Sequence, residues 1–210
     1  MTPDKRYGAR APIVKEQKPP RADARRNRER VLDTADRVFA AEGMGVPTDE
    51  IARRAGVGPG TLYRHFPTKE ALFMAVAVSR VKASIEEARR LAKSRDPAAA
   101  LFDYLRGLGA QFEARRDLIE VMAARGQSLH EAHPELAREL NAAIGTLLTN
   151  AQTAGAVRSD VTVDDVMNLV VGVFSASTQF GRGSKTAGRL LAVVFDGLRA
   201  PRSQTSAKGC

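Results

Sequence analysis

The sequence predicts an all-α protein with a small three-helix head over residues 23–68 and a larger helical bundle over residues 69–200. Apolar residues recur with the 3.6-residue period of a helix along most of this length. No stretch alternates with the period of two that a half-buried strand requires. Glycines and prolines separate the periodic stretches, where they end one helix or begin the next.

The first helix of the head is predicted from Asp23 onward, and Gly43 and Gly45 are expected to end it. Its apolar stripe comprises Val31, Leu32, Ala35, Val38 and Phe39. A short second helix over residues 49–55 follows, and Thr48 is the expected N-cap because its hydroxyl can accept a hydrogen bond from a first-turn N–H.

A tight turn at residues 56–58 separates the second helix from the third. Pro59 suits a first helical position, so the third helix is predicted to run from there to about Phe66. Pro67 ends it, and Thr68 is expected to cap the next helix. The helices of the bundle are then predicted at about residues 69–94, 97–114, 117–125, 134–154, 163–180 and 185–199.

The composition excludes several classes of protein. The only cysteine is Cys210, which rules out an internal disulfide framework or a thiolate metal site and fits a reducing cytoplasm. No apolar run reaches the roughly 18–20 residues of a membrane helix, and no secretory signal is evident. The formal net charge of +9 suggests nucleic acid or another anionic surface as a partner.

Most of the positive charge lies at the N-terminus. Residues 1–30 hold ten Lys or Arg and four Asp or Glu, a net charge of +6. Residues 1–22 are predicted to be a disordered basic arm, and residues 201–210 a disordered tail. The arm fits two roles equally well, a solubilising tail or a segment that follows the phosphate backbone or a minor groove of DNA.

The two short helices and their glycine-containing turn form a helix-turn-helix, a unit whose second helix can enter the major groove. Leu62 and Phe66 give that helix one apolar edge. Gly58 and Gly60 carry no side chain that would hold the backbone away from DNA. The polar side chains left facing outward suit contacts with phosphates and base edges, and they are Thr61, Tyr63, Arg64 and His65.

The run from Arg30 to Phe73, RVLDTADRVFAAEGMGVPTDEIARRAGVGPGTLYRHFPTKEALF, resembles the TetR family of bacterial transcription regulators. The features in common are the first-helix stripe, Ile-Ala-x-x-Ala-Gly-Val, and Leu-Tyr-x-His-Phe followed by a Lys-Glu pair. The resemblance implies that this region binds DNA through Thr48, Gly58, Thr61, Tyr63, Arg64, His65 and Lys69.

Some of these residues also have purely structural interpretations. Thr48 can simply cap a helix, Tyr63 can lie against the first helix, and His65 can join the head to the fourth helix. Arg64 would read a guanine or hold a phosphate. Gly58 departs from the serine or threonine that the family often has there, so this position has no side chain with which to bind DNA.

The resemblance also implies a dimer and an effector pocket in the bundle. The dimer is expected to form through the last two helices, at Val166, Leu169, Val170, Val173, Leu190, Val194 and Leu198, although these stripes also suit the core of one subunit. The candidate pocket residues also suit a core, and they are Phe73, Phe102, Leu105, Phe112, Met122, Met167 and Phe174. His130, His133 and Gln179 are the candidate polar anchors, and both histidines are expected in a loop.

The preferred interpretation is therefore a cytoplasmic homodimer that represses transcription at an inverted repeat in double-stranded DNA and is released by an unidentified small molecule. The alternative is a DNA-binding regulator that needs no effector or is controlled by a partner, with a non-specific basic arm. The sequence offers no phosphate loop, nucleophilic triad or metal-ligand set, so we expect no enzyme, cofactor, metal site or membrane contact.

Overall fold

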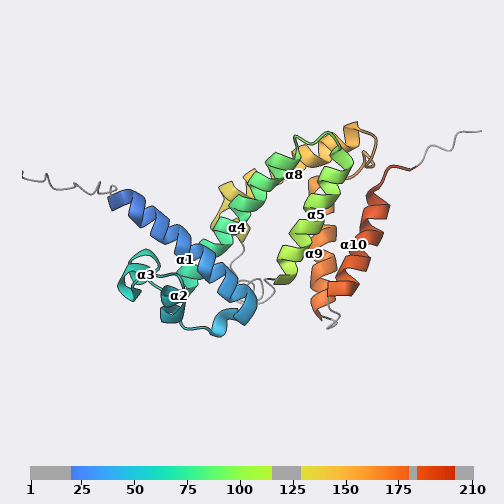
Figure 1. Ribbon diagram of the computed structural model, residues 1–210. Helices are drawn as coiled ribbons and strands as arrows, with labels where there is room; N and C mark the ends of the chain where they lie inside the picture. The colour runs from blue at the N-terminus through green and yellow to red at the C-terminus, as the bar shows by residue number, and fades with distance from the viewer. Residues whose placement is uncertain (1–19, 115–128, 180–183, 202–210) are drawn as a thin grey trace, which may run out of the picture.

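The computed structural model describes residues 20–114, 129–179 and 184–201, and this part of the chain consists of helices joined by turns and loops, with no strand (Figure 1). The all-α prediction is therefore confirmed. Three helices form the head at one end, α1 (Pro20–Glu42), α2 (Thr48–Arg54) and α3 (Pro59–His65). A long helix, α4 (Lys69–Leu91), leads from the head into the bundle. The bundle adds α5 (Pro97–Ala114), α7 (Leu129–Ala132), α8 (Pro134–Thr153), α9 (Val163–Gln179) and α10 (Ser184–Leu198).

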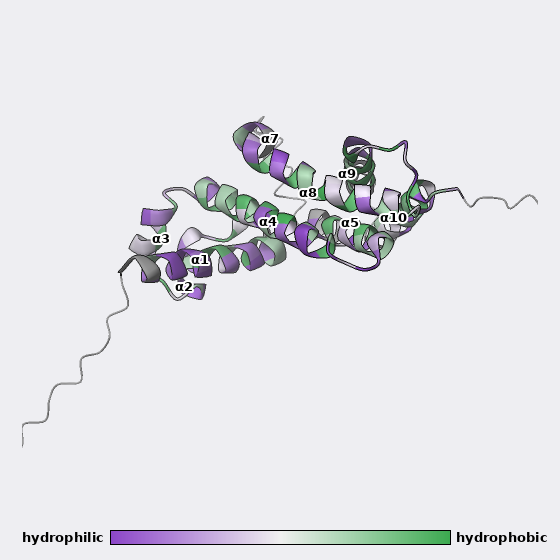
Figure 2. Cartoon of the chain, turned by 90° about the horizontal axis from the view of Figure 1, so that it is seen from above, coloured by the Kyte–Doolittle hydropathy of each residue, from purple (hydrophilic) through white to green (hydrophobic). Residues whose placement is uncertain are grey.

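The head has its own hydrophobic core, and α4 contributes to it. The apolar stripe of α1 is buried against Ile51 of α2 and Leu62 of α3. Leu72 and Val76, from the first two turns of α4, complete the cluster. Figure 2 shows α1 as mainly hydrophilic outside this stripe, as expected for a helix with one buried face.

The bundle core is a second cluster, and α4 contributes to it as well. Ile85 and Ala88 of α4 lie among buried residues of α5, α8, α9 and α10. A polar pair crosses from α4 to α5, where the hydroxyls of Ser84 and Tyr104 are hydrogen-bonded at 2.8 Å with both side chains buried. One continuous helix thus connects the two cores.

The bundle is tightly packed where α9 crosses α5. A Cβ atom at Gly109 of α5 would lie 2.2 Å from Cζ of Phe174 in α9 and 3.2 Å from Cδ1 of Leu191 in α10. No real Cβ contact is as short as the first of these, so only glycine allows the Phe174 ring to approach α5 so closely.

Several helix boundaries differ from the sequence predictions. Helix α1 begins at Pro20, three residues before Asp23, and α4 ends at Leu91. Thr48 is the first residue of α2, and the N-cap is Pro47, whose carbonyl oxygen accepts hydrogen bonds from Glu50 N and Ile51 N. The N-cap prediction for Thr48 was therefore wrong, because Pro47 already has the extended backbone of a cap.

Residues 129–132 form the short helix α7, so the expected loop around His130 was wrong. His133 is the N-cap residue of α8 but makes no side-chain capping bond. The predicted helix at 117–125, residues 1–19 of the basic arm and the tail beyond Pro201 lie outside the described residues. Residues 20–22, predicted as the end of the disordered arm, are instead the start of α1. In the described ranges, no helix is long and apolar enough to cross a membrane, and no three potential metal ligands cluster.

Candidate nucleic-acid interface

The turn between α2 and α3 has the backbone that the sequence predicted. Gly56 has a positive φ of 65°, which glycine adopts without strain. Val57 N donates to Ala52 O at 3.1 Å, which closes the end of α2. Gly58 is the N-cap of α3, and its carbonyl oxygen accepts hydrogen bonds from Thr61 N at 2.9 Å and Leu62 N at 3.2 Å.

Helix α3 has one buried and one open face. Leu62 and Phe66 are buried in the head core, as predicted. Tyr63 and Arg64 are exposed, whereas Thr61 and His65 are half-buried. The outward-facing residues thus offer a hydroxyl, a phenol, a guanidinium and an imidazole on one short helix.

The glycines at the start of α3 are not required by the fold of the chain. A Cβ atom added at Gly58 or at Gly60 would find no other atom within 4 Å. Gly58 also has an ordinary φ of −68°, which any residue adopts. Since neither packing nor backbone geometry within the chain requires a glycine here, the open space above them is free for an external partner.

Tyr63 is held at the surface by the start of α2. Its hydroxyl lies within the influence of the Asp49 carboxylate and the Thr48 hydroxyl. The interaction with Asp49 raises the pKa of the Tyr63 phenol above its ordinary value, since the carboxylate favours the protonated phenol. Thr48, predicted as a DNA contact, therefore lies beside Tyr63, another predicted contact. The sequence pattern did not point to this role for Asp49, whose carboxylate also suits the dipole of α2.

The start of α4 lies next to α3. The Thr68 hydroxyl oxygen accepts a hydrogen bond from Ala71 N at 3.1 Å, so Thr68 is the N-cap that the sequence predicted. Lys69 follows as the first residue of α4 and is half-buried.

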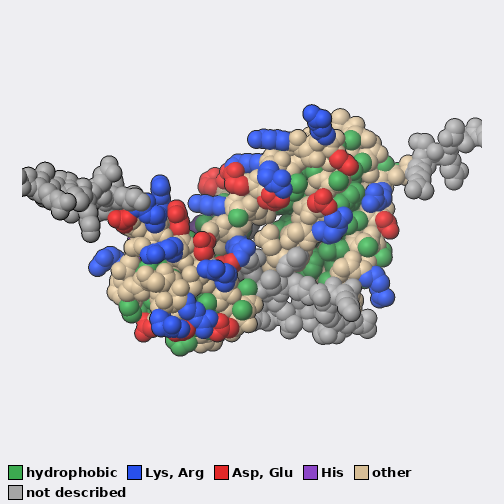
Figure 3. All heavy atoms as spheres, viewed as in Figure 1, with side chains coloured by type: hydrophobic (Ala, Val, Ile, Leu, Met, Phe, Trp, Pro, Cys, Tyr) green, Lys and Arg blue, Asp and Glu red, His purple; other side chains and the backbone are tan. Residues whose placement is uncertain are grey.

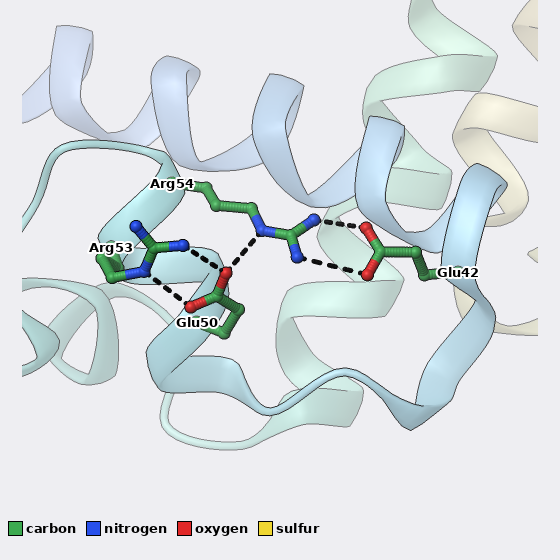
Figure 4. Close-up of polar contacts among 4 residues, drawn as sticks. All are labelled: Glu42, Glu50, Arg53 and Arg54. Atoms are coloured by element: carbon green, nitrogen blue, oxygen red, sulfur yellow. Dashed lines mark hydrogen bonds and ion pairs between the residues drawn. The ribbon is translucent and has the colours of Figure 1, made fainter.

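The arginines at the end of α2 are bound to carboxylates (Figure 4). Arg53 donates two hydrogen bonds to Glu50, at 2.7 and 2.6 Å. Arg54 donates to Glu50 at 2.7 Å and also pairs with Glu42 at the end of α1. These hydrogen bonds, first from Arg53 and then from Arg54, lower the pKa of Glu50 to about 2. Arg54 therefore ties α2 to α1, and both guanidinium groups have fewer donors left for an external phosphate.

A second surface stands out by its exposed apolar side chains. The described part of the chain exposes five large hydrophobic residues, and apart from Tyr63 they all lie on α9 and α10. They are Leu169, Val171, Leu190 and Val193. Two stripes with helical spacing result, Leu169, Gly172, Val173 and Ala176 on α9 and Leu190, Val193, Val194 and Gly197 on α10.

The residues predicted for a dimer interface divide between two adjacent faces of these helices. Leu169 and Leu190 are exposed, and Val173 and Val194 are half-buried. Val166, Val170 and Leu198 are instead buried in the core of their own subunit. The sequence spacing alone did not separate the two faces because both are apolar.

The residues predicted for the effector pocket are mostly packed against their own chain. Phe73 of α4 meets Phe39 of α1 edge-to-face, with ring centroids 5.7 Å apart, so it packs against the head. Phe102 contacts Phe195 at 5.1 Å, and Leu105 and Phe174 are buried in the bundle core. Met167 is partly buried against that core. The structure does not describe the side chains of the remaining candidates, Phe112, Met122, His130 and Gln179.

The comparisons with known proteins cover both parts of the chain. Residues 31–76 match the family model for bacterial regulatory proteins, tetR family, and residues 96–200 match that of the transcriptional regulator SbtR-like, C-terminal domain. Two Pseudomonas putida regulators, TtgW and SrpR, are each 45% identical over 60 residues, 28% of this chain. The match spans 45% of TtgW and 28% of SrpR, less than half of either relative.

Solved structures match over nearly the whole chain. A TetR transcription regulatory protein from Mycobacterium vanbaalenii is 44% identical with a TM-score of 0.70, and the match covers 87% of this chain and 100% of that one. The TetR transcriptional regulator SCO0520 from Streptomyces coelicolor is 32% identical with a TM-score of 0.66, over 82% of this chain and 98% of its own.

Proposed function

Since the chain belongs to the TetR family of helix-turn-helix, DNA-binding transcription regulators, we propose that it is a homodimeric repressor that leaves its operator when a small molecule binds its bundle. The observation that carries the DNA-binding part is the open face of α3. Gly58 and Gly60 leave room above the backbone, and Tyr63 and Arg64 are exposed beside them. A major groove admits a helix of this kind, whose first residues then approach the base edges.

The contacts divide by chemistry. Arg64 and Thr61 are suited to base edges, while Tyr63, His65 and Lys69 are suited to phosphates. Thr48 would contribute beside Tyr63, since its hydroxyl is close enough to influence the phenol. Gly58 contributes its backbone N–H at the positive end of the α3 dipole, where an anion is favoured.

A second copy of the chain is the proposed occupant of the apolar stripes on α9 and α10. Val193 is 65% exposed and Leu169 44%, which is unfavourable for side chains of their size. Small residues at Gly172 and Gly197 permit close approach of a partner helix. Paired around a two-fold axis, two such helices from each subunit form a four-helix interface. Two heads related in this way would reach major grooves about 34–36 Å apart, which corresponds to an inverted repeat.

Release by an effector is supported by the continuity of α4. A ligand that changes the packing of Ile85 in the bundle core would displace the same helix that carries Leu72 in the head core. The protein would then have two conformations, one that binds DNA and one that does not. The ligand could lower the affinity for DNA only as far as it binds the second conformation more tightly than the first.

The first experiment is to select bound sequences from random DNA with the purified protein. An enriched inverted repeat supports a sequence-specific dimer, whereas salt-sensitive binding without any preferred sequence contradicts it. Tyr63→Ala should weaken binding to the selected sequence about tenfold or more while leaving the dimer intact in sedimentation, and unchanged affinity would remove Tyr63 from the interface. Release of the selected DNA in a metabolite screen tests the effector, and complete insensitivity favours the effector-independent alternative.

A further inference from the structure

The first turns of α1 extend beyond the head. The first buried residue of this helix is Val31, and the described side chains before it are all exposed except the half-buried Asn27. The segment from Pro20 to Arg30, here called the α1 overhang, is about 16 Å long at 1.5 Å per residue. Figure 1 shows that it points away from the bundle, on the side of the head where α3 lies. Its described side chains bury no apolar surface in the head core, which they meet where Arg28 lies over the ring of Phe66.

One face of the overhang continues the buried face of α1. Leu32 and Ala35 are buried in the head core, and Arg28 and Arg25 precede Leu32 by four and seven residues. A spacing of three and four residues keeps side chains on one side of a helix. The side of α1 that packs on α2 and α3 after Val31 therefore carries arginines in the overhang.

The position of Arg28 fixes where this face points. Its guanidinium carbon lies 5.3 Å from the centroid of the Phe66 ring, over the residue that follows α3. Arg28 thus lies beside the C-terminal end of the helix that we propose enters the major groove. Figure 3 shows Lys and Arg side chains around these first turns of α1, with Asp and Glu side chains among them.

The charge on this face is left largely uncompensated. Among the described residues, Arg28 has no carboxylate partner, and the Phe66 ring leaves its N–H donors available. Arg25 has only a 3.7 Å contact with Glu29, between side chains that are 76% and 61% exposed. Such an exposed pair is weak and easily exchanged for another anion. On the opposite face, Arg26 pairs with Asp23, and Arg30 donates to Asn27 at 2.6 Å.

We propose that Arg25 and Arg28 bind the phosphate backbone of DNA along the edge of the groove that α3 occupies. This inference rests on the proposed function, and it lengthens the DNA contact beyond the helix-turn-helix. A guanidinium offers paired N–H donors that match two phosphate oxygens, and a fixed helix presents them without ordering a flexible segment. An acidic protein would need the same charge, but the common face with α3 favours DNA.

The test compares two double variants of the full-length chain. R25Q/R28Q and R26Q/R30Q each remove two positive charges from the same overhang, but from opposite faces. Affinity for the selected DNA is measured over a series of salt concentrations. In R25Q/R28Q the slope of log K against log salt should fall by about 0.9 for each phosphate that the variant no longer binds, or about 2 per subunit. The sequence preference should not change, since phosphate contacts carry no base information.

R26Q/R30Q should keep a slope close to that of the wild type. An unchanged slope in R25Q/R28Q, or equal decreases in both variants, would overturn the proposal, because the effect would then be absent or a matter of net charge alone. Thermal unfolding of each variant checks that the helix is intact, and a wild-type Tm in R25Q/R28Q is expected. If the wild type binds specific DNA and the slope is unchanged in R25Q/R28Q, only this inference is refuted. If the wild type binds no DNA, the proposed function is refuted as well.

Discussion

Arg80 of α4 and Asp36 of α1 join the head to the helix that enters the bundle. Arg80 Nε donates to Asp36 Oδ1 at 2.6 Å, and a second contact links Nη2 to Oδ2. The Asp36 side chain is only 12% exposed, so water screens this ion pair less than one at the open surface. The pair lies in a groove of about 410 Å³ between the two helices, which Leu32 and Val76 also line.

Arg80→Met should lower the free energy of unfolding by about 1–3 kcal/mol, because it leaves a nearly buried carboxylate without its charged donor. Urea denaturation followed by circular dichroism measures this. Arg106→Met is the control, since Arg106 pairs with Asp103 three residues away and both are more than half exposed, so its cost should stay below about 1 kcal/mol. Equal effects in both variants would contradict a special role for the Arg80–Asp36 pair.

Gly60→Ala should separate stability from DNA binding. The new methyl group meets no atom of the chain, and alanine favours a helix over glycine by up to about 1 kcal/mol, so Tm should stay level or rise. Affinity for the selected DNA should nevertheless fall, because the methyl group occupies space that the DNA backbone needs. Gly107→Ala, also in open space but in α5, should match its stability without a decrease in DNA affinity. Full affinity in the Gly60 variant would show that DNA does not approach this point.

Gly109→Ala should destabilise the bundle by about 1–3 kcal/mol, since the added Cβ overlaps the Phe174 ring and forces it out of place. Denaturant unfolding, again with Gly107→Ala as the control, measures the difference. A variant as stable as the control would mean that the ring of Phe174 moves aside freely.

The α9–α10 stripes predict a solution property. Leu190→Glu together with Val193→Glu should convert the proposed dimer to a monomer in analytical ultracentrifugation, because two charges cannot be buried unpaired between subunits. Val171→Glu is the control, since Val171 is exposed on α9 but lies off the stripe. A dimer that survives the double substitution would place the interface elsewhere.

The ion network on α2 has a defined pH dependence. The pKa of Glu50 lies at about 2, below its ordinary value of 4.5, so its bonds to Arg53 and Arg54 are fully present above pH 4.5 and disappear as the pH falls through about 2. NMR titration of the Glu50 carboxyl carbon should show a midpoint near pH 2. In R53Q/R54Q the midpoint should move up toward 4.5, and an unmoved midpoint would assign the shift to another cause.

The sequence predicted the head well because each of its signals is local. The glycine turn before Gly58, the proline that opens α3 and the capping by Thr68 depend only on neighbouring residues, and the structure has all three. The prediction failed at Thr48, where two adjacent residues could each serve as a cap and the extended Pro47 took that place.

The bundle was harder to predict because its faces depend on which helices meet. Val170 and Leu169 are adjacent and similarly apolar, yet one is buried in the core and the other is 44% exposed. Phe73 was predicted to line a pocket in the bundle, but its ring contacts Phe39 of the head instead. The contact between Arg28 and Phe66 joins residues far apart in the chain, so spacing gave no sign of it.

The continuity of α4 also fixes an angle. Leu72 and Val76 face one core and Ile85 and Ala88 face the other, along 23 residues with no break. A single residue inserted between Ala77 and Ser84 would rotate the head by about 100° about the helix axis and shift it by about 1.5 Å. The number of residues in α4 therefore sets the rotation of each head relative to its bundle. In a dimer it would also set the orientation in which the two recognition helices meet the DNA.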